Sequence, residues 1–197
     1  MTANLGFESR GDPRVGASDR ELWGRVVGGD QAAFEVLFQR HLGVVWNHGY
    51  RLTGSWDAAE DLASGAFLVA WRRRESAVVV GDSVVPWLLT VVGNLVREER
   101  RSLWRRGRVH RRVAQLPTSV DDHADDVVAR LDARARVAAV AQAIGKLPAA
   151  LRRVSELCLV GEVDTAAAAE LLGVSETTVR VNLSRARARL RTMVGEQ

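Results

Sequence analysis

The residues best suited to contact a polyanion stand close together near the C-terminal end of the sequence. Between Ser175 and Arg191, five arginines face a single acid, Glu176. Guanidinium groups bind phosphates and base edges through paired N–H donors, and hydroxyl groups add further hydrogen bonds. On a helix, one face of this stretch would carry Thr177, Arg180, Val181, Ser184 and Arg185, with Arg187, Arg189 and Arg191 at its flanks. The chemistry that this pattern favours is nucleic-acid binding.

Two short helices joined by a tight turn would position these side chains. An Ala-rich run from Thr165 to Leu172 is followed by Gly173, where a positive φ costs little, and Ser175 can cap the next helix. The apolar stripe of that helix is Val179, Leu183, Ala186 and Leu190. A small Ala169, the turn glycine and a buried Val179 at these spacings predict a helix-turn-helix whose second helix enters the major groove. The alternative is an amphipathic surface helix that ends in a solvated charge run.

A second basic surface is predicted on a helix that begins near Pro86. Its buried side would carry Leu88, Val91, Val92 and Leu95, and its other side Thr90, Asn94, Arg97, Arg101 and Trp104. An amide, two guanidinium groups and an indole can hydrogen-bond phosphates and bases and stack on unpaired bases. The alternative is a solvated helix with a half-buried Trp. From 97 to 112 there are eight Arg against two Glu, and a phosphate backbone would balance that charge.

Composition agrees with a helical protein that binds a polyanion. The 197 residues are 47% hydrophobic, contain only four Pro and carry a formal net charge of +4, with a sequence pI near 10.4. A single cysteine, Cys158, excludes an internal disulfide. The sequence contains neither a long apolar span nor a signal peptide, so we expect a cytoplasmic protein.

The expected fold is all-α, with two small helical domains joined by a flexible acidic linker. After a tail over 1–18 that we expect to be disordered, the first domain spans 19–113 with helices over 19–27, 31–52 and 56–74, a loop over 75–85 and the helix that begins near Pro86. The linker, 114–133, contains Asp121, Asp122, Asp125 and Asp126. The second domain, 134–194, contributes helices over 134–145 and 149–160 before the helix-turn-helix.

With both domains in view, the chain resembles bacterial RNA polymerase sigma factors of the extracytoplasmic-function (ECF) class over about 19–191. In the first domain the resemblance rests on Gly29-Asp30 with Ala33-Phe34, on Ala59-Glu60-Asp61-Leu62 with Phe67 and Ala70-Trp71, and on Pro86-Trp87-Leu88-Leu89 through Asn94 to Arg101. In the second domain it rests on Leu147-Pro148, Gly161, Leu172-Gly173-Val174-Ser175, Thr178-Val179-Arg180 and Leu183-Ser184-Arg185-Ala186.

The resemblance implies a protein that binds core RNA polymerase and promoter DNA without cofactor, metal or catalysis. Glu60, Asp61, Leu62 and Phe67 would dock on the clamp helices of the largest polymerase subunit, and the loop over 75–86 would catch a base flipped from the −10 element. Asn94, Arg97, Glu98 and Arg101 would read and melt that element. Thr177, Arg180, Ser184 and Arg185 would read the −35 element, with Arg187 on the phosphates. An anti-sigma factor is a common partner in this family, and the linker would thread toward the active-site cleft.

The chain departs from the family pattern at three places. Ser64-Gly65 stands where members usually carry Gln and an acid, and Gly93 stands where Arg is frequent. In the first helix of the helix-turn-helix, the run from Ala166 to Ala169 replaces an aromatic residue and acids. These positions bear on polymerase docking, on the −10 contacts and on phosphate contacts, respectively.

Two other function classes are weaker interpretations of the sequence. A transcription regulator that binds duplex DNA without polymerase explains the helix-turn-helix equally well, but it does not explain the first domain. An enzymatic function is weaker still, because the sequence contains no P-loop and no nucleophile motif. His41 and His48, seven residues apart, could be metal ligands on one helix face, but a pair that is half-buried or has its hydrogen bonds satisfied is the favoured interpretation.

Overall fold

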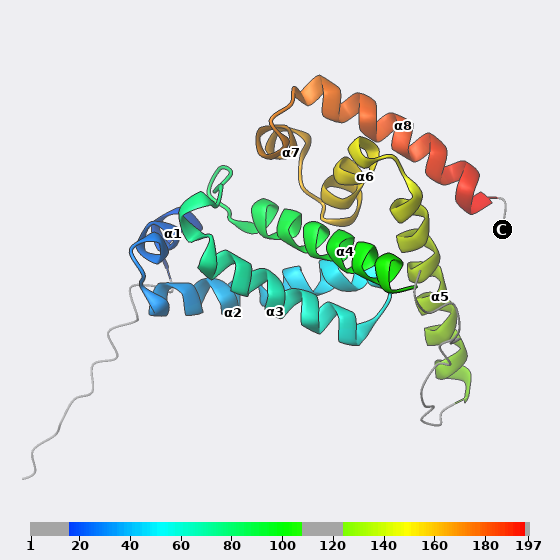
Figure 1. Ribbon diagram of the computed structural model, residues 1–197, viewed down its shortest axis with the longest axis horizontal. Helices are drawn as coiled ribbons and strands as arrows, with labels where there is room; N and C mark the ends of the chain where they lie inside the picture. Colours follow the sequence, from blue (N-terminus) through cyan, green and yellow to red (C-terminus); the bar gives the residue numbers. More distant parts are fainter. Residues whose placement is uncertain (1–15, 108–123, 196–197) are drawn as a thin grey trace, which may run out of the picture.

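The computed structural model describes residues 16–107 and 124–195, and within these ranges the chain is built from helices (Figure 1). The first domain contains α1 (Asp19–Val27), α2 (Gln31–Thr53), α3 (Trp56–Arg72), the 3₁₀ turn η1 (Arg74–Ser76) and α4 (Val85–Gly107). The second contains α5 (Ala124–Lys146), α6 (Ala149–Ser155), the π-helical turn η2 (Glu156–Val160), α7 (Thr165–Leu172) and α8 (Glu176–Gly195). The helical fold class that the sequence predicts is confirmed.

The helices of the first domain begin where the sequence provides a cap. The Ser18 side chain accepts a hydrogen bond from the Glu21 amide, and the Glu21 carboxylate accepts one from the Ser18 amide at 2.9 Å, which forms a capping box before α1. Asp30 and Ser55 accept from backbone amides at the starts of α2 and α3. The predicted starts of these three helices are confirmed, and α2 ends at Gly54, whose φ is +71°.

The first domain packs α2, α3 and α4 side by side, with α1 across one end (Figure 1). Its core holds apolar side chains that are at most 5% exposed, among them Leu22, Leu37, Val45, Leu62, Phe67 and Val92. A buried carboxylate, Asp19, links three segments where α1 meets the rest of the domain. It accepts from Arg40 Nη1 at 2.8 Å and from the Val84 amide at 3.1 Å, so α1 is joined to α2 and to the residue before α4.

The two domains pack against each other, which the sequence left open. Leu89 of α4 is 1% exposed and lies in the apolar cluster of the second domain with Val154, Leu157 and Val179. On the outside of the contact, Arg51 Nη1 donates to the Val160 carbonyl at 2.9 Å. We call this packing of η2 and α7 against α4, together with that of α5 against α2, the closed arrangement.

Helix boundaries differ from the expected ones at three places. Helix α5 begins at Ala124, inside the predicted linker and before the predicted start at 134. The sequence puts Asp125 and Asp126 in its first turn, where acids favour the helix dipole, so the acidic stretch that indicated a linker also starts a helix. Helix α3 ends at Arg72, and the expected helix over 149–160 finishes as the π-helical turn. The rest of the predicted linker, 114–123, and most of the tail lie outside the described residues.

Among the helices that the structure describes, none combines the length and the apolar character needed to cross a lipid bilayer.

Candidate nucleic-acid and polymerase surfaces

The predicted helix-turn-helix is present in α7 and α8, with each of its positions in the expected role. Gly173 turns the chain with a φ of +65°, and Ser175 Oγ accepts from the Thr178 amide at 3.1 Å. Ala169 is 7% exposed and Val179 is fully buried between the two helices. Because small and β-branched residues fill the angle between the helices, α8 is fixed against α7 with its polar face outward.

The polar face of α8 is exposed along its length. Its predicted DNA contacts, Thr177, Arg180, Ser184, Arg185 and Arg187, all lie on the surface. Glu176, at the start of α8, accepts from Thr165 Oγ1 at 2.5 Å and from Arg180 Nη2 at 2.6 Å. These two hydrogen bonds lower the pKa of Glu176, so the carboxylate stays ionised and holds Arg180 along the helix.

The predicted −10 residues on α4 are divided between two environments. Asn94, Glu98 and Arg101 are exposed, whereas the side chain of Arg97 is only 18% exposed. Arg97 donates to Asn94 Oδ1 and, through Nη1, to Glu156 Oε2 of the second domain at 2.6 Å. The closed arrangement therefore holds one of the four side chains inside an interdomain ion pair. Trp104, which the sequence put on the same arc, has a side chain outside the described residues.

Glu156 is a buried acid in the contact between the domains. It is 5% exposed, and burial raises its pKa, while the charges of Arg97, Arg152 and Arg100 oppose that rise. Its carboxylate reaches α4 beside Gly93, where a Cβ atom would lie 3.0 Å from Glu156 Oε2. The Gly93 that departs from the family pattern is thus the residue that gives Glu156 room beside the helix.

A pocket of about 310 Å³ lies on the side of α4 that faces α3 and η1. Its lining includes Trp87, Thr90, Asn94 and Glu98 from α4 and Arg73 from the end of α3. An aromatic ring beside amide, hydroxyl and charged groups suits an unstacked base. Thr90, Asn94 and Glu98 were predicted from the sequence to lie on an exposed or −10 surface, whereas Trp87 and Arg73 were not predicted site residues. Only the packing of α3 against α4 brings Trp87 and Arg73 to the same pocket.

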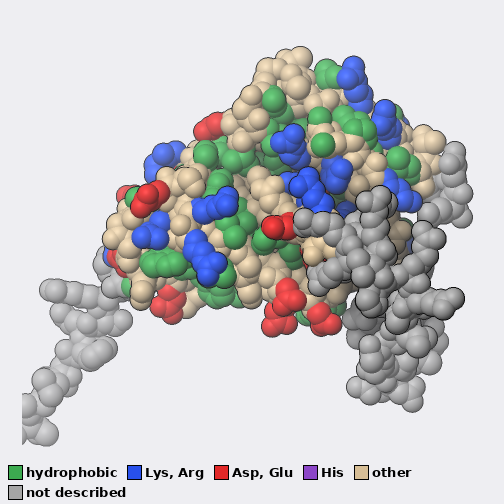
Figure 2. Space-filling view, in the orientation of Figure 1, with side chains coloured by type: hydrophobic (Ala, Val, Ile, Leu, Met, Phe, Trp, Pro, Cys, Tyr) green, Lys and Arg blue, Asp and Glu red, His purple; other side chains and the backbone are tan. Residues whose placement is uncertain are grey.

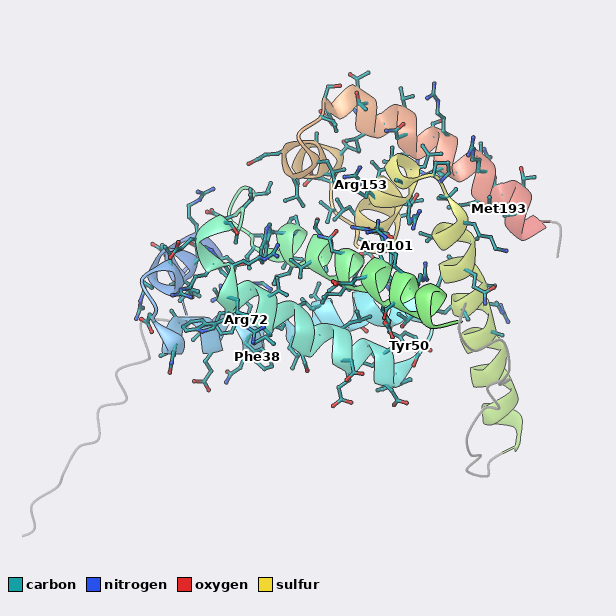
Figure 3. The ribbon with its side chains drawn as sticks, in the orientation of Figure 1. Phe38, Tyr50, Arg72, Arg101, Arg153 and Met193 are labelled. Carbon is teal, nitrogen blue, oxygen red and sulfur yellow. The ribbon has the colours of Figure 1, made fainter. Side chains whose placement is uncertain are left out.

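A larger cavity, of about 820 Å³, lies on the other side of α4, between the two domains. Its lining includes Asn94 and five arginines, Arg97, Arg100, Arg101, Arg152 and Arg153. Figure 3 shows Arg153 on α6 close to Arg101 on α4, and the space-filling view shows Lys and Arg side chains gathered at this place (Figure 2). Arg152 and Arg153 were not among the predicted site residues, because their own helix carries no further basic stripe.

The predicted polymerase-docking residues are also divided. Glu60 and Asp61 are exposed near the start of α3, and acidic side chains gather along that edge of the molecule (Figure 2). Leu62 and Phe67 are 5% and 4% exposed and pack in the core, so the expectation that they lie on a docking surface is corrected. They face inward because α3 buries the apolar face opposite its acids.

An aromatic cluster beside these acids was missed by sequence analysis. Trp56 is 59% exposed, and its ring centroid lies 4.5 Å from that of Trp46 and 6.1 Å from that of Tyr50. The spacing of Trp46 and Tyr50, one helical turn apart on α2, was the available signal. At Ser64-Gly65, where the chain departs from the family pattern, Ser64 is exposed on α3, whereas Gly65 faces Leu95 of α4.

The two histidines of α2 are buried more deeply than the expected half-buried pair, and neither ring nitrogen of His48 has a hydrogen-bond partner among the described residues. His41 and His48 are 8% and 2% exposed, and His41 Nε2 lies 2.7 Å from Asp19 Oδ2. Burial lowers the pKa of His48 to about 4, so its ring is neutral in the folded protein at pH 7.

Two sequence families match the chain, one in each domain. Sigma-70 region 2 matches residues 37–106, which run from α2 to α4, and Sigma-70, region 4 matches residues 137–190, which run from α5 to α8. The chain is 34% identical over 170 residues to the ECF RNA polymerase sigma factor SigL of Mycobacterium tuberculosis, and the match covers 85% of this chain and 92% of SigL. It is 29% identical to SigM of the same organism, over 90% of this chain and 85% of SigM.

Solved structures share the fold over most of the chain. CnrH, solved in complex with the cytosolic domain of CnrY, is 25% identical with a TM-score of 0.62, and the match covers 92% of this chain and 99% of CnrH. The sigma factor RpoE of Bartonella quintana, solved with the anti-sigma factor NepR, has a TM-score of 0.53 at 22% identity, over 82% of this chain and 96% of RpoE.

Proposed function

Because this chain belongs to the ECF class of RNA polymerase sigma factors, we propose that its two domains divide the recognition of one promoter between them. A sigma factor acts by binding, since it directs core polymerase to a promoter and helps to open the DNA there. This proposal rests on two basic helices in one chain. Helix α8 has an exposed polar face, and helix α4 lies beside a pocket of about 310 Å³, a size that suits one base.

The −35 element is assigned to the exposed face of α8. Arg180 and Arg185 have exposed guanidinium groups that can reach base edges and phosphates once Arg180 exchanges its exposed pair with Glu176, and Thr177 and Ser184 add hydroxyl groups on the same face. Arg187, on the flank, would bind a phosphate. Each specific groove contact contributes about 1–3 kcal/mol of discrimination.

The −10 element is assigned to α4 and to the pocket between α4 and α3. Trp87 would stack on an unpaired base in the 310 Å³ pocket, while Asn94 and Glu98 at its rim offer hydrogen bonds. Trapping a base outside the helix offsets part of the unstacking cost, which is a few kcal/mol. Arg97 and Arg101 would then bind the displaced strand once the domains have separated.

Polymerase docking is assigned to the exposed edge of α3. Glu60 and Asp61 supply negative charge, and the exposed Trp56 beside them supplies apolar area, so the surface suits a partner helix with basic and apolar side chains. We also propose that an anti-sigma factor binds this chain, as NepR binds the sigma factor RpoE of Bartonella quintana. The protein would bind core polymerase and promoter DNA in the cytoplasm.

The test combines co-purification with core polymerase and run-off transcription over a promoter library. Arg180→Ala should lower transcription from a cognate promoter about 10- to 100-fold, as the loss of one specific contact predicts, while polymerase binding stays intact. The paired variant Asp61→Lys should do the reverse, weakening polymerase binding while the free protein still binds a duplex through α8. Equal loss of both activities in either variant would contradict the division of labour.

A regulator that acts on duplex DNA without polymerase remains the competing function, because α7 and α8 alone would suffice for it. Co-purification separates the two. A chain that binds operators tightly and ignores core polymerase is the regulator, and the assignments of α3 and α4 then fail together.

A further inference from the structure

The 820 Å³ cavity between the domains holds five arginines, and neither the −35 nor the −10 assignment explains their convergence. Arg97, Arg100 and Arg101 come from α4, whereas Arg152 and Arg153 come from α6. Among the residues that the structure describes, those that line the cavity include no carboxylate. Such a concentration of like charge is unfavourable in the empty cavity and favours an anion inside it.

The charge inside the cavity is only partly compensated. Arg97 is paired with Glu156, which is buried behind it, and Arg100 donates to the Leu52 carbonyl at 3.2 Å. Arg152 donates to the Leu147 carbonyl at 3.3 Å, and the charge of Glu156 acts on Arg152 and Arg100 without a direct hydrogen bond to either, so one buried carboxylate is shared among three arginines. Arg101 and Arg153 are exposed and, within the described ranges, form no ion pair with a carboxylate.

Small residues in the walls of the cavity leave room for the arginine side chains. Arg100 is half-buried and lies against Gly145 of α5, where a Cβ atom would collide with its guanidinium group. Burial lowers the pKa of Arg100, and the charge of Arg152 acts in the same direction. A small Ala149 on the opposite wall leaves the space between the arginines open.

We propose that this cavity binds a small oligophosphate, an anion of the class of inorganic triphosphate or a nucleoside triphosphate. The volume lies in the range of small-ligand pockets, and guanidinium groups on several sides match the planar, bidentate recognition of phosphate oxygens. Because α4 and α6 contribute opposite walls, the bound anion holds the domains in the closed arrangement.

The test measures binding of inorganic triphosphate to the full chain by calorimetry at constant ionic strength. One saturable site is expected, and Arg153→Ala should weaken it about tenfold or more, with only part of the loss restored in Arg153→Lys, because an ammonium group lacks the bidentate donors of a guanidinium. Arg189→Ala, which removes an exposed arginine of α8 outside the cavity, should change the affinity less than twofold. Circular dichroism and the melting temperature without ligand would verify that each variant is folded.

Three results would overturn the proposal. Equal weakening by Arg153→Ala and Arg189→Ala, or no saturable binding at all, would mean that the arginines attract anions only through the general field of the protein. A single-stranded oligonucleotide serves as the second probe. If it binds more tightly than triphosphate and loses the same factor in Arg153→Ala, the cavity takes a nucleic-acid backbone and not a small anion. Polymerase is absent from these measurements, so their failure leaves the proposed promoter function untouched.

Discussion

The two basic helices of this protein differ in how much of their surface the free chain exposes. The polar face of α8 is open, and the internal contact of Arg180 is an exposed pair with Glu176. The corresponding face of α4 is covered on one side by the second domain, and Arg97 is held in a buried pair with Glu156. The polar face of α8 is therefore open to a partner, and that of α4 is partly engaged within the molecule.

This difference has an energetic meaning. An exposed ion pair contributes little and exchanges readily for a phosphate, so the pair between Arg180 and Glu176 hardly opposes DNA binding. A buried pair leaves an uncompensated charge when one partner departs. Releasing Arg97 for DNA thus requires Glu156 to leave α4 and reach water, which couples use of the −10 surface to separation of the domains.

The most direct way to break the comparison is to place a charge in the contact between the domains. Leu89→Asp puts a carboxylate among Val154, Leu157 and Val179, and an unpaired buried charge costs about 3–5 kcal/mol. We expect the closed arrangement to open, which small-angle X-ray scattering would record as a larger radius of gyration. Both basic helices should then be equally accessible.

Leu68→Asp is the matched control, because Leu68 is 50% exposed on α3 and the same change there buries no charge. It should leave the radius of gyration unchanged. If Leu89→Asp also left the dimensions unchanged while remaining folded, the covered state of α4 would not depend on this contact.

A pH titration of the protein beside a His48 variant sharpens the comparison, because the difference between the two isolates one titratable group of the first domain. His48 lies in the first domain, and the second domain, 134–194, contains no histidine. With a folded pKa of about 4 against an ordinary 6.5, the unfolded chain binds the proton first as the pH falls. The stability that neutral His48 permits is complete above pH 6.5 and falls by about 3 kcal/mol between pH 6.5 and 4.

The measurement is the free energy of unfolding in urea at several pH values for the protein and for His48→Leu. We expect the variant to lose less stability over that window, with the difference confined to the unfolding of the first domain. Parallel curves for the two proteins would show that His48 titrates normally in the folded state.

The smallest expected effect concerns the salt dependence of duplex binding by the free protein. Each phosphate neutralised by an arginine contributes about 0.9 to the slope of log K against log salt. Arg185→Ala on the open face should reduce the slope by about that amount, whereas Arg97→Ala should leave it unchanged. A reduction of similar size in Arg97→Ala would mean that α4 already contacts DNA in the free chain.

Much of the fold could be predicted because its signals are local. Ser18, Asp30 and Ser55 begin their helices through hydrogen bonds that span three residues, and Gly173 ends α7 through its own φ. The stripe of Val179, Leu183 and Ala186 was sufficient to place the exposed arginines of α8, because 3.6 residues per turn determines the opposite face. The start of α5 was missed because acidic residues favour both a linker and a helix N-terminus.

The α4 surface could not be derived in the same way. Leu62 and Phe67 belong to a family-like motif but face the core, and Trp87 joins a pocket whose other wall comes from α3. Arg152 and Arg153 gain their significance from α4, more than 50 residues earlier in the chain. The residue periodicity within one helix does not predict which residues of another helix it will contact.

The sequence by itself determined the helical class, the caps, the helix-turn-helix and the exposed face of α8, since short-range hydrogen bonds and helical periodicity set all four. Only the tertiary structure decided that Glu156 meets Arg97 beside Gly93 and that five arginines surround one cavity. The physical reason is that the free energy of a charge depends on burial and on its neighbours, and both come from the packing of distant segments.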